Sequence, residues 1–170
     1  ISVGNPYLDP ELTDNYELST SINLKGVFLT TAVFYRHTGN SITSLKDTFS
    51  VRNPNPGVEG FVPAIRTTYQ NIGNENTIGF NVFGNVTLFK IWSLNGGVDL
   101  YNVSLSNNNP NPNYASSNSG LVIGGRMFTN VRFKNGWGIQ GGGGGRGRQI
   151  NLQGNSGGFM FYSIGLRKNF

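Results

Sequence analysis

The sequence predicts an all-β protein, an antiparallel up-and-down β-barrel segment of about seven strands that crosses a membrane. Three observations indicate this fold. Apolar and polar residues alternate along most of the chain, which is the period of a strand with two unlike faces. The 170 residues include 25 glycines and are only 12% charged, so residues that favour helices are scarce. Short turns alternate with longer polar connections, as in membrane-spanning barrels.

The chain opens on a polar loop that leads directly into the first strand. Pro6 and Pro10 fix φ and remove backbone donors, which excludes a helix interior or a central strand at this point. Strict alternation predicts a strand over residues 16–24. Lys25-Gly26 then makes a tight turn into a second strand, residues 27–36. Both faces of that second strand are fairly apolar, so its orientation is left open.

The middle of the chain contains the longest predicted loop. Residues 39–63 are expected to be irregular, and a loop longer than about 15 residues is usually functional or disordered. Residues 66–90 are predicted as one very long strand, with two strands separated at residues 73–76 as the alternative. A turn at Lys90-Ile91 leads into a strand over residues 92–106. The polar loop after it, residues 106–119, cannot form a core.

The last third of the chain predicts three more strands. The fifth covers residues 120–134, and Asn135-Gly136 after it is a strong hairpin signal. The sixth covers residues 137–150 and the seventh residues 157–168. Glycines 142, 144 and 147 match G-x-G-x-x-G, but the βαβ frame of a dinucleotide site is absent. This glycine run therefore predicts a bend, or the close approach of a plug or a neighbouring side chain.

Composition argues against several functional classes. The net charge is +5, yet the basic residues are dispersed and no nucleic-acid motif is found, so no nucleic-acid partner is expected. There is no Cys, His37 is the only histidine and the acids are scattered. We therefore expect no catalytic residues, no cofactor and no metal site, and the protein is not expected to be an enzyme. Ile1 is interpreted as a processed or truncated start.

Five arginines are the candidate site residues. The alternation places them opposite the apolar faces, because a charge that faces lipid near the midplane costs about 2 to 4 kcal/mol. They form a predicted lumenal basic wall of Arg126, Arg132, Arg146, Arg148 and Arg167. Such a wall can attract an anionic ligand. Pairing with acids such as Glu17 and Asp99, or with acids of a plug, is the favoured interpretation, because Arg suits buried ion pairs.

The two ends of the chain resemble a known family. The residues that carry the resemblance are the strand beginning Tyr16-Glu17-Leu18, residues 157–168, and the opening stretch Gly4-Asn5-Pro6-Tyr7-Leu8-Asp9-Pro10-Glu11. Together they are similar to the C-terminal barrel portion of TonB-dependent outer-membrane receptors, specifically the Bacteroidota-type outer membrane protein beta-barrel family. The resemblance spans essentially the whole chain. It implies a location in the outer membrane, and binding and import of a ligand through a plugged lumen.

The resemblance also implies partners. These are outer-membrane lipid, the remainder of a larger barrel with its plug domain, an inner-membrane energy-coupling protein and an extracellular lipoprotein. Single-chain bacterial barrels have even strand numbers, and an open edge in lipid leaves backbone groups unsatisfied. Residues 1–170 are therefore expected to form one segment of a larger barrel, unless one strand is miscounted. Two other functions stay open, namely a non-transporting scaffold or accessory subunit of an outer-membrane complex, and a soluble β-sandwich adhesin or glycan-binding module.

Overall fold

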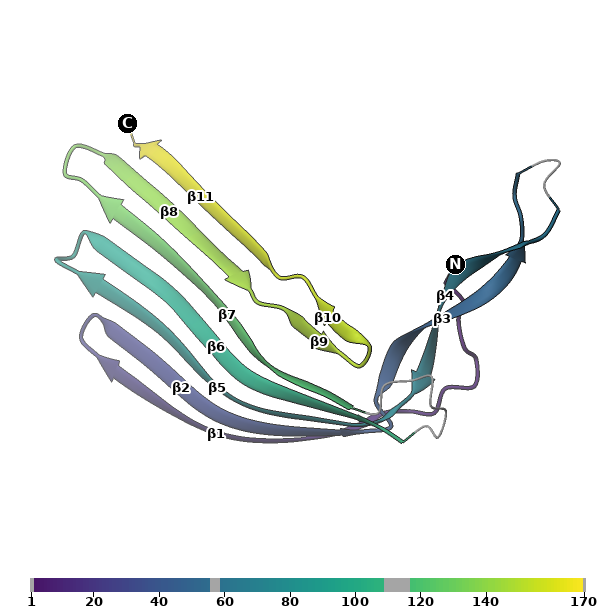
Figure 1. Ribbon diagram of the computed structural model, residues 1–170. Coiled ribbons are helices and arrows are strands. Elements are labelled where there is room, and N and C mark those ends of the chain that lie inside the picture. The colour runs from purple at the N-terminus through teal and green to yellow at the C-terminus, as the bar shows by residue number, and fades with distance from the viewer. Residues whose placement is uncertain (1, 56–58, 109–116, 170) are drawn as a thin grey trace.

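A computed structural model of the protein describes residues 2–55, 59–108 and 117–169, and it is built on one seven-stranded sheet (Figure 1). The strands of this sheet, in spatial order, are β1 (Leu12–Leu24), β2 (Val27–Gly39), β5 (Gly73–Leu88), β6 (Trp92–Asn107), β7 (Ser117–Arg132), β8 (Trp137–Arg146) and β11 (Phe159–Lys168). Every neighbouring pair is antiparallel. The predicted all-β fold with seven antiparallel strands is confirmed. No helix in the described ranges has the length and apolarity needed to cross a membrane.

The connections at the two ends of the sheet differ in length. At one end, which we call the short-turn end, tight turns join β1 to β2, β5 to β6 and β7 to β8 (Figure 1). Backbone bonds tie these turns to the next strand along the sheet, as in Thr87 N to Gly26 O at 2.7 Å and Arg132 N to Ile91 O at 2.8 Å. These are the three predicted turns. The opposite end, the long-connection end, carries the long connections; most of the predicted loop 106–119 there lies outside the described residues.

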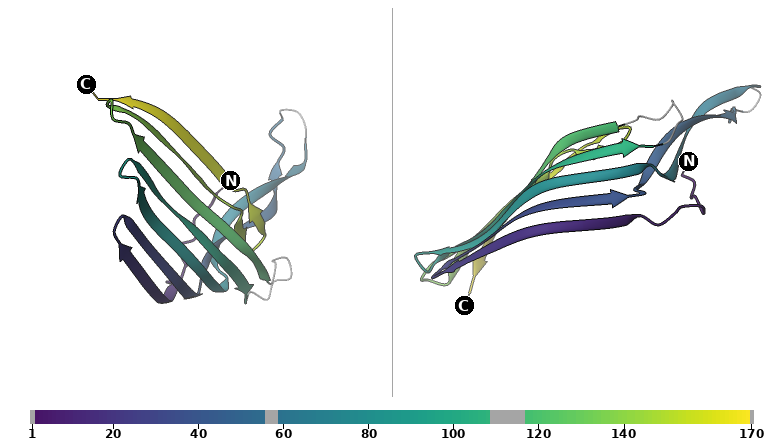
Figure 2. Two further views of the ribbon diagram at one scale, coloured as in Figure 1. Left: turned by 90° about the vertical axis from the view of Figure 1, so that its left-hand side faces the viewer. Right: turned by 90° about the horizontal axis from the view of Figure 1, so that it is seen from below.

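The sheet is curved (Figure 2), and its two faces differ in chemistry. One cross-strand row on the convex face consists of Leu18, Val33, Phe80, Leu100 and Ile123. The neighbouring row on the concave face consists of Glu17, Phe34, Gly79, Tyr101 and Val122. The apolar side chains of the convex face are open to the surroundings, reaching 84% exposed at Met160 and 88% at Tyr162. This register also fixes the orientation of β2, whose Val33 side lies on the convex face.

The predicted irregular region, residues 39–63, is wrong for most of its length. It contains a second, smaller sheet, the hairpin of β3 (Ile42–Arg52) and β4 (Phe61–Asn71). Of the residues between these strands the structure describes 53–55 and 59–60, and Asn53 Oδ1 accepts the backbone N–H of Asn55 at 3.0 Å there. Most of the predicted irregular region is therefore a pair of hydrogen-bonded strands.

The single long strand predicted over residues 66–90 is also wrong, because the chain breaks between β4 and β5. Gly73 has φ of +126°, and a Cβ atom there would lie 2.4 Å from Ser106 O. The neighbouring Ile72 is buried, and its N–H donates to Ser41 O at 2.9 Å. At this point the chain stops pairing with β3 and starts pairing with β2. The two-strand alternative is correct, with the break just before residues 73–76.

Several strand boundaries also differ from prediction, among them those of the first and sixth predicted strands. The first strand begins at Leu12, so it is longer than predicted at its start. The sixth predicted strand is shorter, because β8 ends at Arg146 and the chain turns into a hairpin of β9 (Gln149–Asn151) and β10 (Gly154–Ser156). This hairpin leaves the main sheet and reaches across the concave side towards β3 and β4 (Figure 1).

The main apolar core lies where the two hairpins meet the long-connection end. We call it the cap cluster, and its buried members are Leu45, Ile72, Val103, Leu105, Val122 and Leu152. Gln153, beside Leu152, is bound to the β3 backbone. Its Oε1 accepts Lys46 N–H at 2.6 Å and its Nε2 donates to Lys46 O at 3.0 Å. The cap cluster therefore joins the β3–β4 hairpin, strands β6 and β7 of the main sheet and the β9–β10 hairpin, which are far apart in the sequence.

The opening loop runs along the free edge of β4. Val3 N–H donates to Thr67 O at 2.9 Å and Asn5 Nδ2 donates to Tyr69 O at 2.9 Å. Asp9 N–H donates to Asn71 Oδ1 at 3.0 Å. The prediction of a polar loop that leads into the first strand is confirmed, and the loop also holds the β3–β4 hairpin in place.

Candidate functional site on the concave face

The concave face of the sheet encloses a hollow of about 1060 Å³. Its charged lining residues are Glu17, Arg36, Glu75, Asp99, Arg126 and Arg146, and its aromatic lining residues are Phe34, Phe83, Tyr101, Phe128, Phe159 and Phe161. Residues of the β9–β10 hairpin border the hollow on the side of the cap cluster. Charged groups, amides and aromatic rings thus share one surface that faces away from the apolar convex side.

Arg146 is the best-fixed cation in the hollow. It extends from the end of β8 to the Tyr101 side chain on β6, where its Nη2 donates a hydrogen bond to the phenol oxygen. Its guanidinium carbon lies 5.8 Å from the centroid of the Tyr101 ring, within range of a cation–π contact. The Tyr101 ring lies 6.4 Å from that of Phe34. Arg146 is therefore positioned by a neutral aromatic side chain, and its charge is not neutralised by that contact.

The glycine run of β8 leaves room for the aromatic ring of Phe128. A Cβ atom on Gly142 would come within 2.2 Å of Phe128 Cδ1, so Phe128 occupies the space that a side chain there would need. Its ring lies 6.5 Å from that of Phe161. The predicted close approach of a neighbouring side chain to this run is confirmed. A strand hairpin follows the run instead of a helix, so it is no dinucleotide loop.

The structure divides the five predicted arginines into three groups. Arg126 and Arg146 line the hollow on the concave face. Arg132 and Arg167 lie on the same face, in one cross-strand row with Gly138, near the short-turn end. Arg148 does not belong with them, because β8 ends at Arg146 and Arg148 lies in the link to β9. The role of the remaining four in ligand binding stays a prediction.

The favoured pairing of these arginines with Glu17 or Asp99 is not formed. Among the described residues, the ion pair within 4 Å joins Arg66 Nη2 and Asp47 Oδ2 at 2.8 Å. That pair lies in the β3–β4 hairpin, outside the hollow. Glu17 and Asp99 line the same hollow as Arg126 and Arg146, but no ion pair within 4 Å joins these acids and arginines among the described residues. The hollow therefore presents separate positive and negative groups.

His37 and the acids do not form a metal site in the described part of the chain. His37 Nδ1 donates to Asn76 Oδ1 at 2.8 Å, and Tyr35 OH donates to the same oxygen at 2.9 Å. No cluster of three or more His, Cys, Asp or Glu side chains suited to an ion is found among the described residues.

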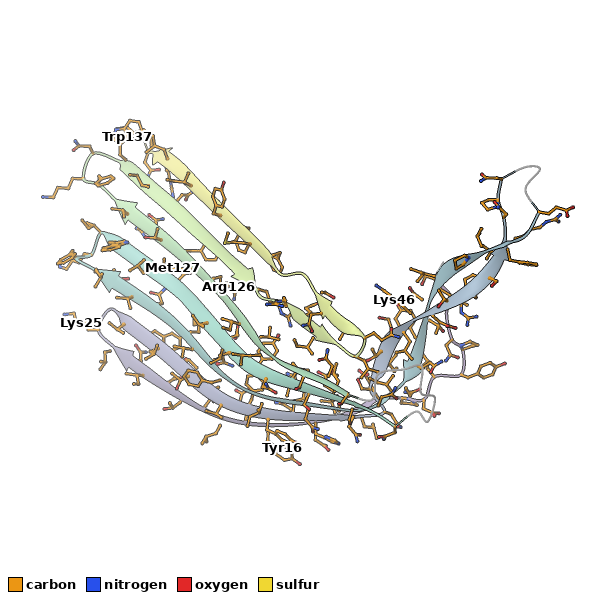
Figure 3. The ribbon with its side chains drawn as sticks, viewed as in Figure 1. Tyr16, Lys25, Lys46, Arg126, Met127 and Trp137 are labelled. Atoms are coloured by element: carbon orange, nitrogen blue, oxygen red, sulfur yellow. The ribbon has the colours of Figure 1, made fainter. Side chains whose placement is uncertain are left out.

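Aromatic residues on the convex face suit a membrane interface. Tyr16 stacks on Tyr35 with centroids 6.4 Å apart, and Figure 3 shows Tyr16 on the outer side of the sheet. Trp92, beside a short turn, donates from Nε1 to Thr129 Oγ1 at 2.7 Å. Tyr101 lies on the concave face and packs on the cap cluster. Sequence reasoning missed its role, because the bond to Arg146 joins residues 45 positions apart.

The convex face exposes many apolar side chains, as the lipid-facing surface of a membrane barrel does. No second sheet packs against the convex face in the described residues, as the soluble β-sandwich alternative would require. The edges of the main sheet are β1 and β11. In the hydrocarbon core of a bilayer every backbone polar group needs a partner within the protein.

Comparison with known proteins agrees with this geometry. Searches of curated proteins and of solved structures gave no match. The family described as the outer membrane protein beta-barrel family matches residues 1–170. With its apolar convex face, polar concave face and unequal connections, the chain belongs to the outer membrane protein beta-barrel family, and its location is the outer membrane.

Proposed function

We propose that this chain forms part of the wall of an outer-membrane receptor of the TonB-dependent type, which binds a ligand in its lumen and imports it past a plug. The observation that carries the proposal is the hollow on the concave face. Arg126 and Arg146 line it without an acid partner among the described residues. A wall of unneutralised charge with aromatic faces beside it is suited to hold a polar solute.

The long-connection end supports a receptor as well. The β3–β4 and β9–β10 hairpins meet on the concave side through the cap cluster. They therefore partly cover the concave face at the long-connection end. Long connections of outer-membrane barrels face the outside of the cell, where ligand arrives. These hairpins are the part of the chain that contacts ligand first in this proposal.

The partners are part of the same proposal. The open edges β1 and β11 support further strands that complete the barrel, and a plug domain fills its lumen. The resemblance of the opening motif to TonB-dependent receptors supports an inner-membrane energy-coupling protein and an extracellular lipoprotein. The chain acts in binding and transport, without enzymatic activity and without a nucleic-acid partner.

Uptake from a mixture of many solutes tests the proposal, whichever solute is the ligand. Cells with the wild-type gene, a deletion and the Arg126→Gln/Arg146→Gln variant are grown in a complex medium, and solute depletion is followed by mass spectrometry. At least one solute is expected to disappear at least tenfold more slowly with the deletion and with the variant. A protonophore should stop its uptake by wild-type cells.

The matched control is Arg52→Gln/Arg148→Gln, which removes the same charge from exposed positions outside the hollow. It should behave as wild type at equal amounts of protein in the outer membrane. The receptor proposal fails if the deletion changes the depletion rate of no solute. If, in addition, outer-membrane proteins that purify together from wild-type cells no longer do so in the deletion, the chain is a scaffold.

A further inference from the structure

A second pocket lies at the rim of the short-turn end, where side chains of the concave and convex faces of β8 both line it, away from the large hollow. It has a volume of about 130 Å³, and its polar lining includes Asn130, Arg132, Gln140, Arg167 and Asn169. We propose that this pocket binds a phosphate group. The proposal does not depend on transport, because neither Arg132 nor Arg167 lines the hollow.

The strand register brings the two arginines together over a glycine. Arg132 of β7 pairs with Gly138 of β8, and Gly138 pairs with Arg167 of β11. Two strand spacings put the Cα atoms of the arginines about 10 Å apart. Gly138 between them is buried and has no side chain, so an anion can lie between the two guanidinium groups.

Among the described residues, the side-chain hydrogen bond of Arg167 uses Nε and leaves its two terminal nitrogens available. Its Nε donates to Asn169 Oδ1 at 3.0 Å, which orients the guanidinium group. The Nη atoms are not engaged by this bond. Guanidinium groups match the oxygens of a phosphate in bidentate fashion, and amide groups of Asn130 and Gln140 add donors around the same pocket.

The charge around the pocket is of one sign. Lysines occupy the short-turn end at Lys25, Lys90, Lys134 and Lys168. The acids are elsewhere: Asp9, Glu11, Asp14, Glu17 and Glu75 lie towards the long-connection end, Asp47 and Glu59 belong to the β3–β4 hairpin, and Asp99 is in the middle of β6. An anion at this pocket therefore meets positive potential without competition from a carboxylate of the described residues.

Two sources can supply the phosphate, a lipid headgroup at the membrane interface or a phosphate ion in solution. Phe133 and Trp137 line the same pocket, and the Lys168 ammonium lies 5.0 Å from the Trp137 ring centroid. Aromatic residues of this kind sit at headgroup level in outer-membrane barrels. Both sources present the same phosphate group to the pocket, and the experiment below distinguishes between them.

Binding to two probes tests the inference on the purified protein. One arm measures bound phosphatidylglycerol by native mass spectrometry from detergent micelles, with phosphatidylcholine as the neutral reference. The other arm measures binding of inorganic phosphate by equilibrium dialysis. The wild type is expected to bind at least one probe, and Arg132→Gln/Arg167→Gln should bind that probe at least tenfold more weakly. The arm that responds identifies the source.

The control Arg52→Gln/Arg148→Gln removes the same charge away from the pocket and should bind within about twofold of wild type. Arg167→Gln alone, at an exposed position near the end of β11, provides a second variant if the double variant does not fold. The inference is overturned if the wild type binds neither probe. It is equally overturned if the folded pocket variants and the control lose binding to the same extent.

Discussion

Replacing Val98 by arginine is expected to lower the free energy of unfolding in a lipid bilayer by about 2 to 4 kcal/mol. Val98 lies on the convex face of β6, in one row with Val82 and Gly125. A membrane-spanning strand takes about 9 to 11 residues, so counting from Trp92 at the short-turn end puts Val98 near the midplane. A guanidinium group at this position faces hydrocarbon and loses its hydration.

The matched substitution on the other face is Asn81→Arg. Asn81 lines the hollow and pairs with Asp99, so the same charge meets water and a carboxylate there. Its expected cost is below about 1 kcal/mol, as for lumenal or surface substitutions. Urea unfolding of both variants in phospholipid vesicles, followed by tryptophan fluorescence, measures the difference. Equal losses for the two variants would mean that the convex face does not contact lipid.

Replacing Leu152 by alanine is expected to release the β9–β10 hairpin from the cap cluster. Leu152 is 2% exposed and packs in the cluster that contains Leu45, which is fully buried. Removal of a buried leucine side chain costs about 2 to 5 kcal/mol. This energy holds a short hairpin rather than the main sheet, so the loss is expected to appear as local opening.

Hydrogen exchange followed by mass spectrometry measures this opening. Peptides covering residues 42–52 and 149–156 should lose protection in Leu152→Ala, whereas peptides from β5 and β6 should keep it. The control is Leu121→Ala, which makes the same change at an exposed position on the convex face. If both variants exchange like wild type, Leu152 does not anchor the hairpin.

The main sheet was predictable because its strands carry the strict alternation that one lipid-facing side imposes. The turns at Lys25-Gly26 and Asn135-Gly136 were equally clear from local chemistry. The orientation of β2 was not, because Phe28 and Phe34 make its concave face as apolar as its convex one. Only pairing with β1 and β5 decides which side faces out.

The hairpins were missed for a different physical reason. Strands β3 and β4 lie outside the main sheet, so no lipid imposes a uniform apolar face on them, and their polar pairs include Asp47 with Arg66. The break at Gly73 depends on a positive φ. Glycine permits this backbone conformation, but the presence of a glycine in the sequence does not predict it. Local composition therefore predicted an irregular region over residues 39–63 and missed the strands β3 and β4 that begin within it.

For the candidate site, the sequence predicted only which face of the sheet each arginine lies on. Alternation assigned Arg126, Arg132, Arg146 and Arg167 to one face, and the register places them there. The contact of Arg146 with Tyr101 and the pairing of Arg132 with Arg167 across Gly138 depend on strand order. Arg148 was misplaced because the glycine run gives no sign of where β8 ends.

Single-cysteine labelling along β6 tests most directly whether the convex face contacts lipid and the concave face contacts water. The 170 residues contain no cysteine, so each introduced thiol reports one position of this segment. In lipid vesicles, cysteines at Asn95 and Asp99 are expected to react with a water-soluble maleimide, whereas those at Val98 and Leu100 should be protected from it. Equal reactivity at all four positions, or protection of the concave pair alone, would contradict the account.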